Sequence, residues 1–303
     1  MSIESAYIWM DGELVPFADA KVHVLSHSLH YGLGVFEGIR SYEQEGGGGG
    51  VFKLDEHLRR LIDSAKMCRM DLTLSIDDLR KACLDTLAKN EFSSAYIRPL
   101  VYLGMGGMGL GARNNPVHTS IMVWKWGAYL GDEGINNGIR VATSSFTRHH
   151  VNANLQRAKI TGHYVNSILA RYEANDNGYD EAIMLDHSGY VAEGTGENLF
   201  ISRDGVIKTP PIVNILGGIT RKTSIQILEH EGHKVQETTF GRDALYVADE
   251  IFMTGTAAEV TPVREVDRRP VGPPGPITKM VQRTYLDGVR GKVDWMKPMI
   301  TTY

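Results

Sequence analysis

The chain is organised around residues 154–164, which read NLQRAKITGHY. Lys159 precedes a run in which Tyr164, Ile168 and Tyr172 recur every four residues, the spacing of one buried helix face. This spacing predicts that Lys159 lies at a helix start, where partial positive charge favours loss of the lysine proton. A neutral lysine amine can form a Schiff base with a carbonyl group. The alternative is a solvated lysine in the first helical turn.

Length and composition bound the class of protein. A chain of 303 residues with 42% apolar content is long enough for two domains. A net charge of −4 and the lack of a basic block argue against nucleic acid as a partner. Cys68 and Cys83 are the only cysteines, so we expect a reducing compartment, the cytoplasm. No stretch predicts a signal peptide or a membrane span.

Both halves of the sequence mix predicted strands and helices. Asp11-Gly12 between two apolar runs indicates a hairpin, and later strands are expected near residues 35–42, 94–103 and 118–126. Asp55 is a plausible helix cap, and Ser75 with Asp78 is a relative of the capping box. We expect a small N-terminal α/β domain over residues 1–126, an interdomain loop over 127–137 and a large C-terminal domain over 138–303.

Two suggestive patterns do not predict a site. His23, His27 and His30 have no acid or cysteine among them and no clear helix to align them, so we expect no metal. Residues 104–109, GMGGMG, match the dinucleotide fingerprint letter for letter. The motif needs a helix directly after it, and residues 110–116 cannot open one, so we interpret this stretch as a pliable loop.

The second half contains polar residues at the ends of predicted elements. Glu193 and Glu197 bracket a small-residue turn beside Asn198, where backbone can approach a ligand closely; an acidic surface turn is the alternative. Two glycines before Thr220 at a helix start favour an anion site, unless Thr220 merely caps its own helix. A lysine for an aldehyde, a carboxylate for a ring nitrogen and amides for a phosphate are what pyridoxal 5'-phosphate requires of a protein.

Several stretches in the same order carry a family resemblance. They are LHYG at 29–32, VFEGIR at 35–40, YIRPL at 96–100, AK at 158–159, EGTGENLF at 193–200, GITR at 218–221 and GTAAE at 255–259. Over nearly its whole length the chain resembles the branched-chain amino acid aminotransferases, which are fold-type IV, class IV pyridoxal phosphate enzymes. The resemblance implies a mixed α+β, α/β fold like that of D-amino acid aminotransferase, with the cofactor between a smaller N-terminal and a larger C-terminal domain.

The resemblance also implies roles around the cofactor. Lys159 would carry pyridoxal 5'-phosphate as a Schiff base and move the proton at the substrate α-carbon. Glu193 would sit against the pyridine nitrogen, and Tyr164 would bond the ring oxygen. The other implied cofactor-binding residues are Arg60, Leu216, Ile219, Thr220 and Thr256, of which Arg60 and the amides of Ile219, Thr220 and Thr256 would hold the phosphate. The family spacing after His57 favours Arg60 over its neighbour Arg59.

The implied substrate pocket accounts for transfer of the amino group from leucine, isoleucine or valine to 2-oxoglutarate, which gives branched-chain 2-oxoacids and L-glutamate. By resemblance, Phe36, Tyr164 and Trp126 form an apolar wall, and Tyr31 and Leu110 come from a second subunit of a homodimer or larger homo-oligomer. Tyr96 and the amides of Thr256 and Ala257 would bind the α-carboxylate. Arg98 and Tyr129 would bind the side-chain carboxylate of glutamate. Arg98 in a strand has the alternative of a structural ion pair.

Other activities of the same fold compete with this interpretation. A D-amino acid transaminase usually carries an arginine and a histidine one residue apart on the loop that here spans residues 106–110, and neither is present. An amine transaminase and an aminodeoxychorismate lyase would use the same lysine. A pyridoxal phosphate carrier protein is the non-enzymatic alternative, and it would leave the pocket residues without a purpose.

Overall fold

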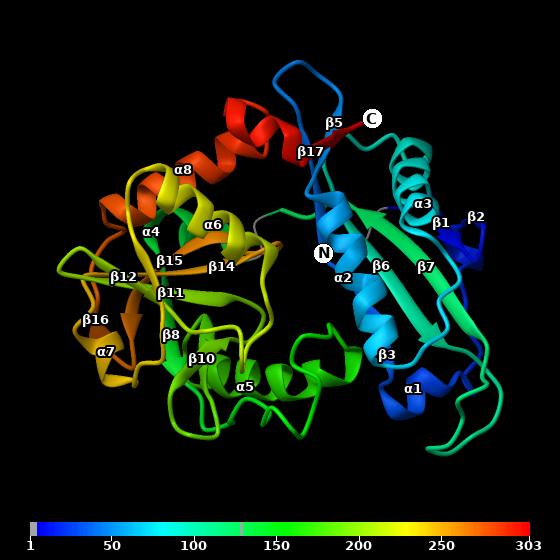
Figure 1. Cartoon of the computed structure of the whole chain (residues 1–303), viewed down its shortest axis with the longest axis horizontal. Coiled ribbons are helices and arrows are strands. Elements are labelled where there is room, and N and C mark those ends of the chain that lie inside the picture. Colours follow the sequence, from blue (N-terminus) through cyan, green and yellow to red (C-terminus); the bar gives the residue numbers. More distant parts are fainter. Residues whose placement is uncertain (1–4, 128–129) are drawn as a thin grey trace. The chain divides into compact units, whose positions relative to one another are not determined.

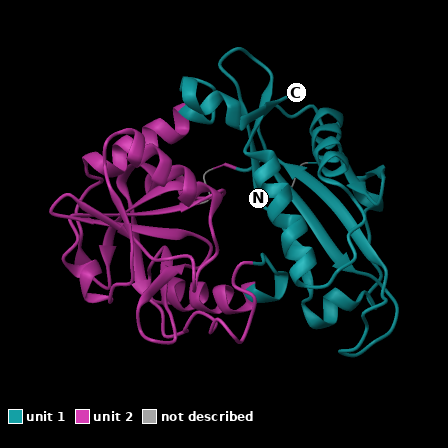
Figure 2. Cartoon of the chain, viewed as in Figure 1, with its two compact units in different colours: residues 1–126, 158–163, 288–303 teal, residues 127–157, 164–287 magenta. Residues whose placement is uncertain are grey.

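The computed structural model describes residues 5–127 and 130–303 and divides into two compact units (Figure 2). Unit 1 contains residues 1–126, 158–163 and 288–303, and unit 2 contains residues 127–157 and 164–287. Unit 2 therefore differs from the expected domain of residues 138–303, because Lys159 and the last residues lie in unit 1. Long-range pairing explains the difference, since Ile160 forms an antiparallel bridge with Val35.

Unit 1 is built on an antiparallel sheet with the order β17-β5-β4-β6-β7-β1-β2, and β3 pairs with β6 beside this path (Figure 1). Its strands are β1 (Tyr7–Met10), β2 (Glu13–Pro16), β3 (Gly34–Phe36), β4 (Ile39–Glu43), β5 (Gly49–Phe52), β6 (Ala95–Leu103), β7 (Val117–Trp124) and β17 (Ile300–Thr302). The expected hairpin is confirmed as β1 and β2, whose turn residues Asp11 and Gly12 both have positive φ. The expected strand at 35–42 is interrupted at Glu37 and Gly38.

Two long helices supply the core of unit 1. The helices are α1 (His27–Tyr31), α2 (Leu54–Met67) and α3 (Ile76–Lys89), with 3-10 turns at Phe17–Asp19, Thr161–His163 and Asp294–Met299. Leu58 and Leu61 of α2 and Leu79 of α3 are fully buried in one cluster with Ile97 of β6. Their spacing of three or four residues within α2 is the helical period that the sequence shows.

The starts of these helices test the predicted caps. The capping box is confirmed, because Asp78 N–H donates to Ser75 Oγ at 3.2 Å and the Ser75 amide donates to the Asp78 carboxylate at 2.9 Å. The prediction that Asp55 caps α2 is wrong. The N-cap is Lys53 in a left-handed conformation, and Asp55 lies in the first turn, where it accepts a hydrogen bond from Arg80 Nε at 2.7 Å.

Unit 2 is built on a mixed sheet with the order β10-β9-β8-β15-β14-β11-β12-β13, and β16 pairs with β15 beside this path. Its strands are β8 (Ile139–Thr143), β9 (Glu181–Leu185), β10 (Val191–Gly194), β11 (Asn198–Arg203), β12 (Val206–Thr209), β13 (Val235–Glu237), β14 (Glu250–Gly255), β15 (Glu259–Val266) and β16 (Arg269–Pro270). Parallel pairs join β8 to β9 and to β15, and β12 to β13, while the other pairs are antiparallel.

The helices of unit 2 are α4 (Gly131–Asn137), α5 (Tyr164–Asp176), α6 (Ile219–His230), α7 (Asp243–Tyr246) and α8 (Pro276–Gly288). Residues 131–137, expected to be part of a loop, form α4, which packs on β15 and ends at Gly138 with a φ of 86°. None of the helices in the described residues is long and apolar enough to cross a bilayer.

The buried face of α5 differs from the face predicted by its aromatic spacing. Ile168 and Tyr172 are exposed, while Ser167, Ala170 and Ala174 are buried toward β8 and β9. Small side chains let the helix backbone approach the sheet closely, so the residues with the least apolar surface occupy the contact. The prediction of a buried Tyr164, Ile168 and Tyr172 face is therefore wrong.

Candidate functional site

Lys159 lies in unit 1, outside any helix. It is followed by the 3-10 turn at Thr161–His163 and then by α5, so the prediction that it opens a helix is wrong. Its main chain is held by two hydrogen bonds: the Lys159 amide donates to Ser64 Oγ at 3.1 Å, and the Phe36 amide donates to the Lys159 carbonyl at 3.0 Å. The Lys159 amine is 5.0 Å from the centre of the Phe36 ring. Tertiary pairing with β3 and α2 therefore positions this lysine.

Arg60 is the arginine of α2 that points into unit 1. Its Nε donates to Glu37 Oε1 at 2.6 Å and its Nη2 donates to Glu37 Oε2 at 2.9 Å, whereas Arg59 is exposed. His57 Nδ1 lies 2.7 Å from the same Glu37 oxygen. Glu37 was not predicted as a site residue, because residues 35–42 were predicted as one continuous strand and nothing local in the sequence relates Glu37 to Arg60.

An aromatic cluster surrounds Arg98 on β6. The Arg98 guanidinium carbon lies 4.8 Å from the centre of the Phe36 ring, 5.2 Å from that of Tyr96 and 5.7 Å from that of Trp124. Arg98 Nη2 donates to the Tyr96 hydroxyl at 3.3 Å, and its buried Nε finds no acceptor among the described residues. Arg98 forms no ion pair with a described residue, so a structural ion pair does not explain it. Trp126 contacts Tyr96 edge-on, with ring centres 4.6 Å apart.

The remaining predicted pocket residues are placed differently. Tyr31, at the end of α1, and Leu110, in the loop between β6 and β7, are exposed on unit 1, and Leu110 exposes 91% of its surface. Tyr129 lies outside the described residues. Tyr164 is the half-buried first residue of α5 in unit 2. Trp124 was missed by the sequence analysis, although its alternation with Trp126 along a strand end is visible in the sequence.

Glu193 is a buried carboxylate on β10 of unit 2, with only 5% of its surface exposed. Arg148 Nε donates to Glu193 Oε1 at 2.8 Å, and Asn198 Nδ2 donates to Oε2 at 3.0 Å. The amide of Leu216 lies 3.3 Å from Oε2. The alternative interpretation of this segment as an acidic surface turn is therefore wrong, because the Glu193 carboxylate is buried and is held by Arg148, Asn198 and Leu216. Arg148 was missed, since nothing local in the sequence relates it to Glu193.

The N-terminus of α6 presents amides without a side-chain cap. Its N-cap is Gly218, which makes no side-chain cap hydrogen bond, and Thr220 is buried within the first turn instead of capping the helix. A Cβ added to Gly218 would lie 1.9 Å from Asn198 Oδ1, so the close approach of the two residues requires glycine at this position. Uncapped amides at the start of a helix favour a bound anion, and these residues fit a phosphate group.

Thr256 and Ala257 lie, half-buried, in the turn between β14 and β15. The nearby Thr254 Oγ1 is buried without a hydrogen-bond partner among the described residues. Thr254 pairs across the sheet with Asn198, so their side chains share a face. A face that binds a ligand leaves buried polar atoms without a protein partner, and Thr254 Oγ1 is such an atom among the described residues. The residues on this face fit pyridoxal 5'-phosphate.

A second buried carboxylate follows Glu193 in the same segment. Glu197 is 4% exposed, and its Oε2 accepts a hydrogen bond from the Gly196 amide at 3.1 Å. Burial, together with the charge of Glu181, raises the pKa of Glu197 to about 8. Glu181 is itself paired with Arg171 and accepts a hydrogen bond from Thr195 Oγ1 at 2.7 Å.

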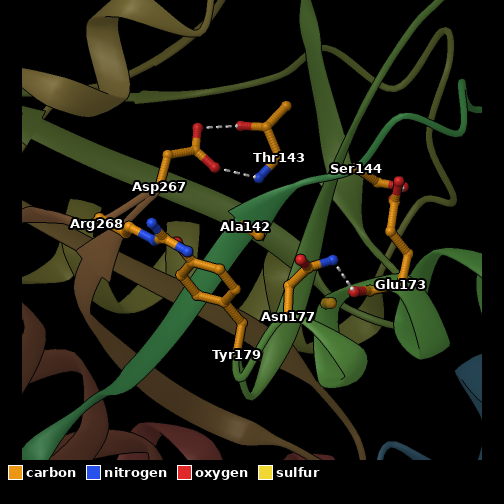
Figure 3. Close-up of a pocket in the computed structure, with 9 residues that line it drawn as sticks. Ala142, Thr143, Ser144, Glu173, Asn177, Tyr179, Asp267 and Arg268 are labelled. Atoms are coloured by element: carbon orange, nitrogen blue, oxygen red, sulfur yellow. Dashed lines mark hydrogen bonds between the residues drawn. The ribbon is translucent and has the colours of Figure 1, made fainter.

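A polar cavity of about 300 Å³ lies elsewhere in unit 2 (Figure 3). It is lined by Ala142, Thr143, Ser144, Glu173, Ala174, Asn177, Tyr179, Asp267 and Arg268. Its two carboxylates are already bonded, Asp267 to the amide and hydroxyl of Thr143 and Glu173 to the hydroxyl of Ser144. None of the predicted site residues lines this cavity.

Known proteins resemble this chain in sequence and in fold. The chain matches the family described as amino-transferase class IV over residues 34–266. The branched-chain-amino-acid aminotransferase of Pseudomonas aeruginosa is 51% identical over 296 residues, which cover 97% of this chain and 96% of that protein. The solved branched-chain amino acid aminotransferase of Escherichia coli is 45% identical, with a TM-score of 0.95 and 99% of both chains covered. That of Thermobaculum terrenum, solved in its holo form with pyridoxal 5'-phosphate, has a TM-score of 0.91 at 33% identity, again over 99% of both chains. The similarity confirms the expected fold class, and the chain belongs to the class IV aminotransferase family.

Proposed function

We propose that this protein is a pyridoxal 5'-phosphate-dependent aminotransferase that moves the amino group of L-leucine, L-isoleucine or L-valine to 2-oxoglutarate. The observation that carries the proposal is the buried Glu193 carboxylate, ion-paired with Arg148 and bonded by Asn198. A buried carboxylate with charged and amide donors has a fixed orientation. The relatives named above support the substrate class, since they are branched-chain amino acid aminotransferases.

When bound, pyridoxal 5'-phosphate supplies an aldehyde that accepts an amino group and a ring that takes up the electrons released at the substrate α-carbon. Lys159 would hold the cofactor covalently, and its amine, once the amino group of the substrate has displaced it, would take the proton from the α-carbon. Glu193 would keep a proton on the ring nitrogen, and Tyr164 would orient the ring through its oxygen. Leu216 completes the contacts near Glu193.

The phosphate is assigned to Arg60 and to the amides of Ile219, Thr220 and Thr256. Arg60 is chosen over Arg59 because Arg59 is exposed. A guanidinium group can donate two bonds to a phosphate at once, and helix amides add a favourable dipole. These donors bind and orient the cofactor without taking part in proton transfer.

The substrate is assigned to the aromatic cluster and its surroundings. Phe36, Tyr164 and Trp126 form the apolar wall for a branched side chain, and Tyr96 with the amides of Thr256 and Ala257 receives the α-carboxylate. The side-chain carboxylate of glutamate is received by Arg98 and Tyr129. In support, Arg98 Nε is buried and lacks an acceptor among the described residues, which is the state expected of a donor that binds a ligand.

The assembly is proposed to be a cytoplasmic homodimer or a larger homo-oligomer in which Tyr31 and Leu110 complete the site of a second subunit. Their exposure in a single chain supports this assignment, because large exposed apolar side chains gather at protein interfaces. The two free cysteines, Cys68 and Cys83, suit a reducing compartment. Sedimentation of the purified protein and fractionation of the producing cells test these two statements.

A half-reaction panel tests the activity. Purified holoprotein is mixed with single L- and D-amino acids while the cofactor absorbance is followed. We expect conversion to pyridoxamine 5'-phosphate with L-leucine, L-isoleucine, L-valine and L-glutamate, and no covalently held cofactor in Lys159→Ala. Conversion by D-amino acids alone, elimination without pyridoxamine 5'-phosphate, or no conversion at all would assign the chain to another transaminase, a lyase or a carrier protein, respectively.

A further inference from the structure

Glu37 holds the most constrained carboxylate of unit 1. It lies directly after β3 and is fully buried, and both its carboxylate oxygens accept hydrogen bonds. Arg60 binds it in a bidentate manner through Nε and Nη2, at 2.6 and 2.9 Å. His57 Nδ1 at 2.7 Å and the Gly38 amide at 3.2 Å reach the same Oε2 atom. A fork-to-carboxylate pair of this kind fixes the plane of the guanidinium group.

The charges of this cluster are settled by its geometry. Burial opposes ionisation of Glu37, but Arg60 and His57 outweigh it and hold the pKa of the carboxyl well below its usual range. Burial lowers the pKa of His57, and the charges of Arg60 and Lys159 act in the same direction against the attraction of Glu37. His57 Nδ1 donates to Glu37, because a carboxylate only accepts.

The same helix ties Arg60 to the lysine segment. His57, Arg60 and Ser64 follow one another on one face of α2, at spacings of three and four residues. Ser64 Oγ donates to the Arg60 carbonyl at 2.7 Å and accepts from the Lys159 amide at 3.1 Å. Phe36, the neighbour of Glu37, donates its amide to the Lys159 carbonyl. Glu37 therefore fixes the Arg60 side chain at the place where the main chain of Lys159 is also fixed.

We propose that Glu37 is a positioning residue that, with His57, orients the Arg60 guanidinium toward the cofactor phosphate. The inference rests on the proposed function and deepens it. Glu37 acts on the phosphate only through Arg60 and does not itself contact the cofactor. Arginine has five N–H groups in one rigid plane. Fixing the edge that carries Nε and Nη2 fixes the direction of every other N–H of that plane.

A purely electrostatic role of Glu37 predicts the opposite result. A negative charge close to a phosphate dianion weakens its binding, so removing that charge without disturbing Arg60 would tighten cofactor binding. Orientation and charge therefore make opposite predictions for the same substitution, and one measurement separates them.

The experiment compares two probes on the full chain after its cofactor has been removed. Pyridoxal 5'-phosphate and pyridoxal both carry the aldehyde, but only the first carries the phosphate. Dissociation constants are measured by absorbance titration for the wild type, Glu37→Gln and the exposed control Glu43→Gln. We expect Glu37→Gln to weaken pyridoxal 5'-phosphate binding by roughly 10- to 100-fold, the range for a hydrogen bond to a charged group. Pyridoxal binding should stay unchanged, and so should both constants in Glu43→Gln.

A double-variant cycle shows whether the effect passes through Arg60. The Arg60→Lys substitution removes the planar guanidinium group. In that background Glu37→Gln should no longer change the ratio of the dissociation constants of pyridoxal 5'-phosphate and pyridoxal. Glu37→Asp keeps the charge but shortens the side chain by one methylene. It should show the same selective loss, and it replaces Glu37→Gln in the test if that variant does not fold.

The outcomes are decisive for Glu37. Unchanged or tighter binding of pyridoxal 5'-phosphate, or equal weakening of both probes, overturns the positioning role. Failure of the proposed function gives a different result, because the wild type itself would then fail the half-reaction panel or form no covalent adduct with either probe, whatever Glu37→Gln does to the two dissociation constants.

Discussion

Replacing the buried Glu197 by glutamine is expected to change how the stability of the protein depends on pH. Burial and the charge of Glu181 raise the pKa of Glu197 from 4.5 to about 8. Between these values the folded protein keeps a proton on Glu197 that the unfolded chain has released. The folded state then binds more protons, so the free energy of unfolding falls as the pH rises. A glutamine at this position carries no such proton.

The slope follows from the linkage relation. One proton bound only by the folded state lowers the free energy of unfolding by about 1.4 kcal/mol for each pH unit. Between about pH 5 and about pH 7.5 this amounts to roughly 3 kcal/mol. The stability of Glu197→Gln relative to the wild type should therefore grow by about that amount across the window, and the difference should level off once the pH passes the pKa of Glu197.

Urea unfolding of both proteins, followed by tryptophan fluorescence at half-unit steps of pH, measures this difference. Glu229→Gln is the matched control, because Glu229 is exposed on α6, and its difference from the wild type should stay flat. A flat difference for Glu197→Gln as well would refute the reasoning, since it would mean that Glu197 is ionised in the folded protein throughout.

Two further predictions concern glycines whose missing side chain makes room for a neighbour. Gly218→Ala would place a Cβ 1.9 Å from Asn198 Oδ1, so we expect thermal and urea unfolding to show a loss of roughly 1–3 kcal/mol. Gly217→Ala, which meets no atom within 4 Å, should change stability by less than about 0.5 kcal/mol, and equal effects of the two would contradict the clash. Gly49→Ala would meet the Tyr303 ring at 2.3 Å, and amide hydrogen exchange should then show faster exchange in β5 and β17; unchanged protection would disprove that contact.

Local signals in the sequence predicted the elements that local interactions build. The hairpin of β1 and β2, the capping box at Ser75 and the strand β6 agree with the structure, because turn residues, caps and alternation act over a few residues. The start of α6 after two glycines was also predicted. Lys159 and Glu193 were singled out as candidates on the same basis.

The features that depend on distant residues were missed. Arg148 reaches Glu193 across 45 positions, and Glu37 reaches Arg60 across 23, so neither pair has a local pattern. Lys159 was predicted to lie at a helix start because the residues after it, from Tyr164 on, have helical spacing. Pairing of the next residue with Val35 places the lysine beside β3 instead. Tertiary contacts overrode propensity at the positions that matter for the site.

The pairing of β5 with β17 has a consequence during synthesis. Residues 300–302 complete a sheet whose partner strand, residues 49–52, is among the first to leave the ribosome. At about 5–20 residues per second, roughly 12 to 50 seconds separate the two strands. Throughout that interval one edge of β5 has unpaired amides and carbonyls, and such an edge invites pairing with other nascent chains. Slow translation of the last third of the message should therefore increase aggregation, and a chaperone that covers this edge should reduce it.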